Sequence, residues 1–149
     1  QTLMNQWKDG AESYLGINVT GFPNFFQLVG PNTALGHNSV IFMIECQVHY
    51  VIESLKLLKK KNARYMNLRE DALKSYNIEI SEGLKNTVWD SGCNSWYTQE
   101  DGKNVTLWPG TTIKYHARTR RVNTDHYHWH EADDGNTEPS THTAAQASS

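Results

Sequence analysis

The spacing of hydrophobic and polar residues along the chain predicts three helices. Apolar side chains recur every three or four positions from Ile41 to Leu58, which indicates a helix of about six turns that Asn38 or Ser39 can cap. A second helix is predicted from Arg69 to Leu84, with its apolar residues on one side. A shorter third helix is predicted from Thr111 to about Arg120.

Two segments near the N-terminus have the composition of strands. Residues Tyr14–Val19 and Phe25–Val29 are rich in aliphatic, aromatic and β-branched side chains, and the sequence "GFPN" between them is typical of a tight turn. A further hairpin is predicted to turn at Asp101-Gly102. The predicted fold class is therefore α/β, or α+β if the chain folds in isolation.

Polar residues dominate the C-terminal end. The stretch "EADDGNTEPSTHTAAQASS" contains no large apolar side chain, so it has nothing to bury against the entropy cost of ordering. We therefore divide the chain into a folded portion, residues 1–128, and a disordered polar tail, residues 129–149. The five tryptophans, seven tyrosines and four phenylalanines supply enough aromatic area for a core of ordinary size.

The composition disfavours several kinds of partner. The formal net charge is −2, and the basic residues form no stripe with interleaved aromatics, which argues against nucleic acid. Cys46 and Cys93 have no metal-ligand spacing, so we expect reduced thiols in a cytoplasmic protein. No apolar run approaches the roughly 18 residues of a membrane span. Because no cap or turn marks a domain boundary after Gln1, we expect the downstream piece of a longer protein.

The sequence contains no self-contained active site. The motifs GxGxxG, GxxxxGK[ST], GxSxG and HExxH are all absent. His126, His128 and His130 alternate and could hold a metal on one face of a strand, but their place beside the polar tail favours incidental histidines, and we predict no metal site. His37 could act as an acid or base near neutral pH. A histidine in such a loop more often only forms hydrogen bonds, so no catalytic residue is assigned.

The start of the long helix is a candidate binding site. A helix N-terminus presents unpaired N–H groups and about half a positive charge, which favour an anion or an electron-rich oxygen. The Gly30-Pro31 turn would let a flat ligand approach the backbone, and residues from Asn38 to Ile41 would direct N–H donors at its rim. These residues alone favour the simpler interpretation, in which Asn38 or Ser39 only caps a core helix.

A resemblance to a known family favours the binding site over the simple cap. The motifs YLG, GFPN, GPN, IExQ and SWY, in this order, resemble the C-terminal region of flavin-dependent monooxygenases, especially the Baeyer-Villiger type and the related flavin-containing monooxygenases. The likeness runs from about Trp7 to Trp129. It implies a chain that completes the FAD domain of an FAD- and NADPH-dependent enzyme with two Rossmann-like domains. Such an enzyme inserts one oxygen atom of O2 into a small organic substrate through a flavin C4a-peroxide.

The resemblance also implies site residues. The loop after Val29 would lead into the flavin site, and the first N–H groups of the long helix would point at flavin N1 and the C2 carbonyl. The implied cofactor-binding residues are Gly30, Pro31, Asn38, Ser39, Val40, Ile41 and Trp96. The implied residues of the substrate pocket are Asn32, Thr33, Ala34 and Leu35. Trp96 of "SWY" would contact NADPH, although the following "TQEDGKNVTLWPG" departs from the Gly-Ala-Asn and Pro-Gly-Lys pattern of Baeyer-Villiger members.

Much of the family's catalytic apparatus has no counterpart in the sequence. Both Gly-rich nucleotide loops, the FxGxxxHxxxWP fingerprint and the arginine that meets the peroxyflavin in ketone-oxidising members are absent. The resemblance therefore implies one wall of a flavin site, with the N-terminal FAD and NADP domains of the same polypeptide as partners. It does not choose between ketones, amines and sulfides. The alternative is a non-enzymatic α+β module whose GPN loop binds a partner or only caps a helix.

Overall fold

The computed structural model describes residues 2–8, 10–33, 39–85 and 108–131. Helices and a small sheet both occur in this part of the chain, which confirms the mixed α/β class. The elements in chain order are α1 (Leu3–Gln6), α2 (Val40–Lys60), β1 (Ala63–Leu68), α3 (Glu70–Lys85), α4 (Thr112–Thr119), the 3₁₀ turn η2 (Thr124–His126) and β2 (Tyr127–Glu131).

The three predicted helices are confirmed, and each begins where its sequence signals place it. Ser39 is the N-cap residue of α2. The first turn of α3 carries Glu70 and Asp71, whose charges complement the helix dipole. The hydroxyl of Thr111 accepts from the backbone N–H of Lys114 at 3.2 Å and so caps α4. Local signals therefore determine the helix starts.

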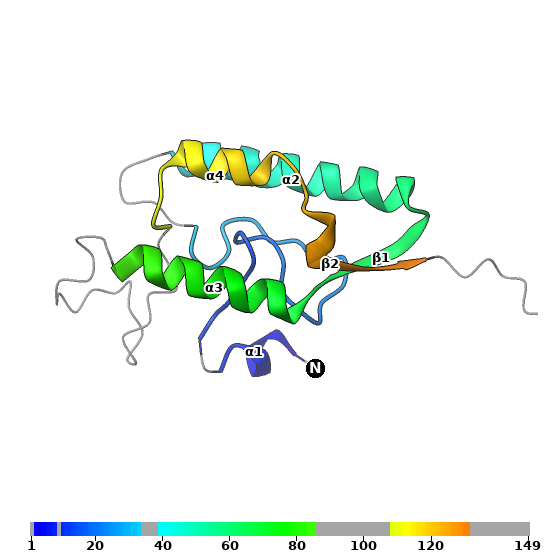
Figure 1. The fold of residues 1–149 in the computed structure, drawn as a ribbon, viewed down its shortest axis with the longest axis horizontal. Coiled ribbons are helices and arrows are strands. Elements are labelled where there is room, and N and C mark those ends of the chain that lie inside the picture. The colour runs from blue at the N-terminus through cyan, green and yellow to red at the C-terminus, as the bar shows by residue number, and fades with distance from the viewer. Residues whose placement is uncertain (1, 9, 34–38, 86–107, 132–149) are drawn as a thin grey trace, which may run out of the picture.

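The helices form two layers around a central coil (Figure 1). Helices α2 and α4 pack against each other on one side, and α3 runs along the other side. Residues 10–33 wind between these layers, where Tyr14 contacts Tyr76 of α3 and the carbonyl of Leu15 accepts from Tyr115 of α4. The core therefore lies around this irregular segment.

The sheet is an antiparallel pair formed by segments far apart in the sequence. Met66 lies opposite Trp129 and Leu68 opposite Tyr127, with an irregularity between Ala63 and Tyr65. The predicted boundary of the polar tail at residue 129 is therefore wrong by three residues, because β2 continues to Glu131. Pairing with β1 and the partial burial of Trp129 order this end. Residues 132–149 lie outside the described part.

The predicted strands Tyr14–Val19 and Phe25–Val29 are wrong in detail. The two segments do lie side by side, since the N–H of Gln27 donates to the carbonyl of Ile17 at 2.9 Å. Left-handed φ angles at Leu15, Asn24 and Val29 interrupt the extended backbone, however, and only an isolated bridge joins Tyr14 to Asn18. The predicted hairpin at Asp101-Gly102 lies outside the described residues.

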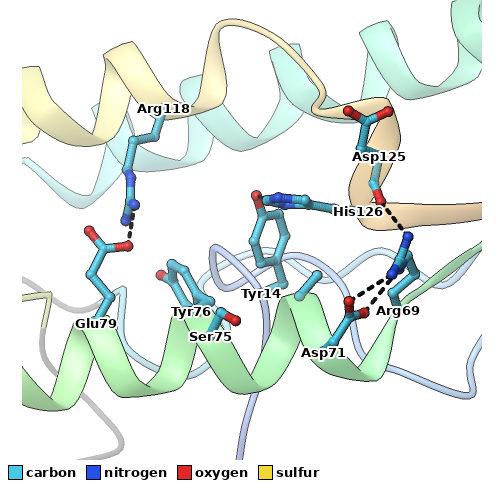
Figure 2. A pocket seen from close by; sticks show the side chains of 10 residues that line it. Tyr14, Arg69, Asp71, Ser75, Tyr76, Glu79, Arg118, Asp125 and His126 are labelled. Atoms are coloured by element: carbon cyan, nitrogen blue, oxygen red, sulfur yellow. Dashed lines mark hydrogen bonds and ion pairs between the residues drawn. The ribbon is translucent and has the colours of Figure 1, made fainter.

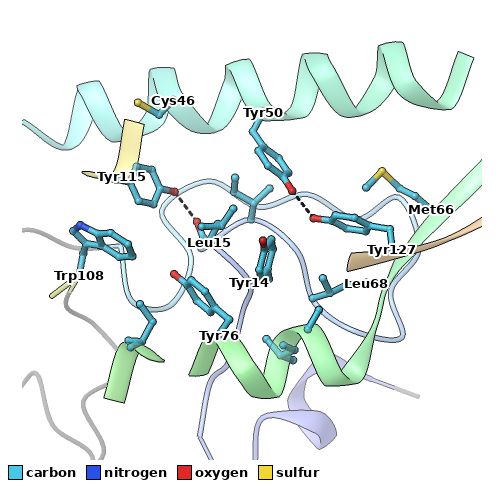
Figure 3. Close-up of a cluster of buried hydrophobic side chains, with 14 of the residues drawn as sticks. Tyr14, Leu15, Cys46, Tyr50, Met66, Leu68, Tyr76, Trp108, Tyr115 and Tyr127 are labelled. Atoms are coloured by element: carbon cyan, nitrogen blue, oxygen red, sulfur yellow. Dashed lines mark hydrogen bonds between the residues drawn. The ribbon is translucent and has the colours of Figure 1, made fainter. Parts of the chain in front are cut away.

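A chain of hydroxyl groups crosses the core (Figure 3). The hydroxyl of Tyr50 lies 2.8 Å from that of Tyr127, which donates to Asn18 Oδ1 at 2.9 Å. The amide nitrogen of Asn18 donates to the carbonyl of Phe25 at 3.0 Å, which fixes the orientation of the amide. Because Asn18 Oδ1 can only accept, Tyr127 donates to it and Tyr50 donates to Tyr127. This chain links α2, β2 and the central coil.

Candidate functional site

The loop at residues 30–33, for which the resemblance implies a place beside a flavin, is held from several directions. The hydroxyl of Ser13 donates to the carbonyl of Pro31 at 3.2 Å, and the hydroxyl of Thr33 donates to the carbonyl of Gly30 at 2.6 Å. Just before the loop, the N–H of Val29 donates to Gln47 Oε1 of α2 at 2.9 Å. These contacts fix the loop against α2 and the central coil.

Two glycines allow the loop to approach the coil closely. The N–H of Gly30 donates to the carbonyl of Gly16 at 3.1 Å. A Cβ at Gly30 would lie 2.5 Å from that same oxygen, and a Cβ at Gly16 would lie 2.0 Å from Cγ2 of Thr33. Gly16 also has a left-handed φ of 69°. Any side chain at either position would push the loop away from its support.

A buried hydrogen-bond network supports the loop from the helix side. Gln47 of α2 is fully buried and donates through Nε2 to the hydroxyl of Tyr115 at 2.9 Å. Tyr115 in turn donates to the carbonyl of Leu15 at 2.6 Å. Burial raises the pKa of Tyr115 well above its usual value, more than its hydrogen bond from Gln47 lowers it, so the phenol stays neutral. The network thereby ties α2 and α4 to the coil.

The backbone N–H groups in the first turn of α2 are hydrogen-bond donors, and the side chain of the N-cap residue, Ser39, does not accept from them. Ser39 adopts an extended conformation at the N-cap, but its side chain makes no capping hydrogen bond. The first turn also carries no acidic residue. A helix start of this kind can bind an electron-rich oxygen, because its N–H groups and the dipole both favour negative charge.

One side of α2 is apolar and exposed. Ile41 is 69% exposed, and further along the helix Val48, Ile52 and Leu55 are also exposed. In the adjoining coil Leu28 is exposed as well. Contiguous apolar surface on a folded domain commonly marks an interface. The helix therefore packs on the core with one face and offers another face for further contacts.

The structure places only some of the predicted site residues. Gly30 and Pro31 are partly buried, whereas Ser39, Val40 and Ile41 are exposed at the start of α2. Asn32 and Thr33 are buried, and Thr33 is fully enclosed. The remaining candidates lie outside the described residues: Ala34, Leu35, His37, Asn38 and Trp96.

The three alternating histidines have separate environments. His126 Nδ1 lies 2.8 Å from the hydroxyl of Tyr14, while His128 and His130 are exposed on β2. The ring of His130 stacks on Tyr65 with 4.3 Å between centroids. Among the described residues, no group of three or more His, Cys, Asp or Glu side chains is placed to hold a metal ion.

Sequence reasoning missed a cavity between α3 and the segment that joins α4 to β2. Its walls combine Tyr14 of the coil with Tyr76, Arg118 and His126 from three other elements (Figure 2). Tyr76 was predicted only as part of the apolar face of a helix, and no local pattern indicates the meeting of these four residues.

Within the part of the chain that the structure describes, none of the helices has the length and hydrophobicity needed to cross a membrane.

Comparison with known proteins identifies relatives. No family model matches the chain. A Baeyer-Villiger monooxygenase of Pseudomonas aeruginosa is 42% identical over 128 residues, which cover 85% of this chain and 24% of that protein. A Baeyer-Villiger monooxygenase of Streptomyces coelicolor is 42% identical over 129 residues, which cover 85% of this chain and 25% of that protein.

Solved structures agree in fold. Cyclohexanone monooxygenase from Rhodococcus sp. Phi1 bound to NADP+ matches with a TM-score of 0.75 and 21% identity, over 87% of this chain and 25% of that one. Oxidized steroid monooxygenase bound to NADP matches with a TM-score of 0.75 and 24% identity, over 89% of this chain and 25% of that one. The chain is thus similar in sequence to these two Baeyer-Villiger monooxygenases and spans about a quarter of their length.

Proposed function

We propose that the chain forms one wall of the flavin site in a longer FAD- and NADPH-dependent monooxygenase. The enzyme inserts one oxygen atom of O2 into a small organic substrate. The nucleotide-binding domains that this sequence lacks belong to the same polypeptide and pack against the exposed apolar side of α2. The relationship to Baeyer-Villiger monooxygenases over 85% of the chain supports the class of reaction.

The residues at the start of α2 fit the rim of a flavin. The observation that carries this assignment is the first turn of the helix, because the Ser39 side chain accepts no capping hydrogen bond from its N–H groups. The flavin supplies the redox and oxygen-transfer chemistry when it is bound. The backbone N–H groups of Ser39, Val40 and Ile41 donate to its electron-rich edge, and the positive end of the helix dipole favours the negative charge of the reduced form.

The loop at residues 30–33 positions this wall. Gly30 brings the loop within hydrogen-bond distance of Gly16. Gln47 of α2 accepts from the N–H of Val29, the residue just before the loop, and so fixes it to α2. The flavin-facing backbone is therefore held by contacts on both sides of the loop, which limits its movement when a ligand binds. We assign Asn32 and Thr33, together with Ala34 and Leu35, to the border of the substrate pocket. Trp96 is assigned to the nicotinamide cofactor.

The proposal is tested by Val40→Pro in the full-length protein. Val40 is the first residue of α2, where proline is compatible with a helix, and Ser39 already has the extended backbone that a following proline requires. The variant therefore removes one N–H donor without breaking α2. We expect weaker flavin binding or slower reduction by NADPH, by about tenfold for one hydrogen bond to a charged group. Flavin content and stopped-flow reduction rates measure the effect.

Two controls separate the lost donor from other changes. Val40→Ala removes the apolar side chain and keeps the N–H, so it should leave flavin binding and reduction near the parent values. Thr112→Pro places proline at the first residue of α4, after a cap residue that is also extended, and should likewise have little effect on the flavin. Unchanged flavin content and reduction rate in Val40→Pro would refute the proposed role of this helix start.

A further inference from the structure

Val29 has a backbone conformation that its own side chain disfavours. The residue lies just before the loop at residues 30–33, and its φ of 54° is in the left-handed region. For a side chain branched at Cβ this conformation is strained. The side chain of Val29 is 42% exposed, so close packing around it does not explain the conformation. Strained backbone persists only where the surrounding contacts hold it, and it clusters at functional sites.

Backbone groups on either side of Val29 are bound to the central coil. The N–H of Gln27 donates to the carbonyl of Ile17 at 2.9 Å, and the N–H of Gly30 donates to the carbonyl of Gly16 at 3.1 Å. The N–H of Val29 itself goes to a different element and donates to Gln47 Oε1 of α2 at 2.9 Å. Gln47 is therefore the acceptor that binds the strained residue directly.

The orientation of the Gln47 amide is fixed at both ends. A backbone N–H can only donate, so Oε1 of Gln47 faces Val29, and Nε2 donates to the hydroxyl of Tyr115 at 2.9 Å. The hydroxyl of Tyr115 donates in turn to the carbonyl of Leu15 at 2.6 Å (Figure 3). Gln47 and Tyr115 are both fully buried. Each proton in this series has one direction, so the acceptor for Val29 is held in place.

Gln47 lies too far along α2 to touch a flavin at the start of the helix. It follows the N-cap residue Ser39 by eight positions, which corresponds to about 12 Å along the helix axis. Its side chain is also enclosed in the core. Any effect of Gln47 on the flavin therefore passes through the backbone of Val29 and the loop that follows it.

We propose that Gln47 is a positioning residue of the flavin wall and that it acts by holding Val29 in the left-handed conformation. The inference rests on the proposed function, because it takes the start of α2 and the loop at residues 30–33 as that wall. Without the Gln47 acceptor, Val29 relaxes to a negative φ and the loop leaves its place. Only the fraction of molecules that keeps the left-handed form then binds FAD with the parent affinity.

The test measures the affinity of the full-length apoprotein for FAD. Gln47→Met keeps the length of the side chain and removes the acceptor, so the Kd for FAD should rise at least about tenfold. In the same background Val29→Gly should return the Kd to within about threefold of the parent, because glycine adopts a left-handed φ without strain. Val29→Ala removes the same apolar side chain but keeps Cβ and hence the strain, so it should not restore the affinity.

Two more variants guard against a loss of folding. Tyr50→Phe removes another buried hydrogen bond of α2, away from the loop, and should leave the Kd for FAD unchanged. Val29→Pro tests the same step from the side of the loop, since proline fixes a negative φ and has no N–H. It leaves the core residue Gln47 in place and should weaken FAD binding at least about tenfold.

The outcomes separate this inference from the proposed function. If Val40→Pro weakens FAD binding and Gln47→Met does not, the helix start belongs to the wall and Gln47 does not position it. If neither change affects FAD, the wall itself is wrong, and the role of Gln47 is wrong with it. Equal recovery with Val29→Ala and Val29→Gly would overturn the inference, because the side chain and not φ would then decide. No recovery with Val29→Gly would mean that Gln47→Met acts through stability alone.

Discussion

The hydrogen bonds from Tyr50 to Tyr127 and from Tyr127 to Asn18 predict how much the protein loses in stability when the Tyr127 hydroxyl is removed. The change Tyr127→Phe removes one oxygen from a side chain that is 4% exposed. Asn18 Oδ1 then loses the only donor recorded for it among the described residues, and the Tyr50 hydroxyl loses its acceptor. The ring itself keeps its packing, since phenylalanine has nearly the same shape.

The size of the effect follows from what is left unpaired. An orphaned buried acceptor costs about 1–3 kcal/mol, and the lost hydrogen bond of Tyr50 adds about 1 kcal/mol. Tyr127→Phe should therefore destabilise the coil and its contacts by about 2–4 kcal/mol. Tyr50→Phe should cost only about 1 kcal/mol, because Tyr127 continues to donate to Asn18. The double variant should cost less than the sum, since both changes act on one network.

Hydrogen–deuterium exchange of the full-length protein measures the loss of stability of the central coil directly. Amides in residues 14–31 should exchange at least about tenfold faster in Tyr127→Phe, because each 1.4 kcal/mol corresponds to about a factor of ten. Tyr76→Phe is the matched control, since its hydroxyl has no partner among the described residues and its loss should not speed exchange. Equal exchange rates in Tyr127→Phe and the parent would refute the reasoning about the hydroxyl chain.

Two further predictions concern the coil and the buried phenols. Gly16→Ala should destabilise the protein by about 2–5 kcal/mol, because Gly16 has a left-handed φ and a Cβ there would clash with Thr33. Gly83→Ala in α3 should change stability by less than about 1 kcal/mol, and equal shifts of the two variants in thermal unfolding would contradict this account. Burial also raises the pKa of Tyr14 and of four other tyrosines, so their stabilising contribution is complete below about pH 10 and is lost as the pH rises further. Urea midpoints that stay constant or rise between about pH 9 and 11 would contradict this dependence.

The start of α2 could be predicted because its signals are local. Asn38 or Ser39 and the apolar repeat that follows them predicted the start of α2. The place of the loop around Gly30 beside a flavin comes from the resemblance of its motifs and stays a prediction. The missing side-chain cap could not be predicted, because serine at this position normally accepts a capping hydrogen bond, and only the structure shows that the Ser39 side chain makes none.

The helices were determined by the sequence itself. The apolar repeats, the acidic first turn of α3 and the Thr111 cap all act within a few residues, so α2, α3 and α4 form where the pattern indicates. The same local reasoning gave strands at Tyr14–Val19 and Phe25–Val29, and there it was wrong. β-rich composition describes residues that fit a half-buried surface, and such residues also fit a buried coil.

Tertiary structure decided what joins distant segments. The pairing of β1 with β2, the hydroxyl chain from Tyr50 to Asn18, and the cavity around Tyr76 each unite residues that no sequence window contains. Their partners are selected by burial, because a polar group enclosed in the core must find an acceptor or donor wherever the fold supplies one. The sequence therefore determined the helices, and packing determined which side chains meet between them.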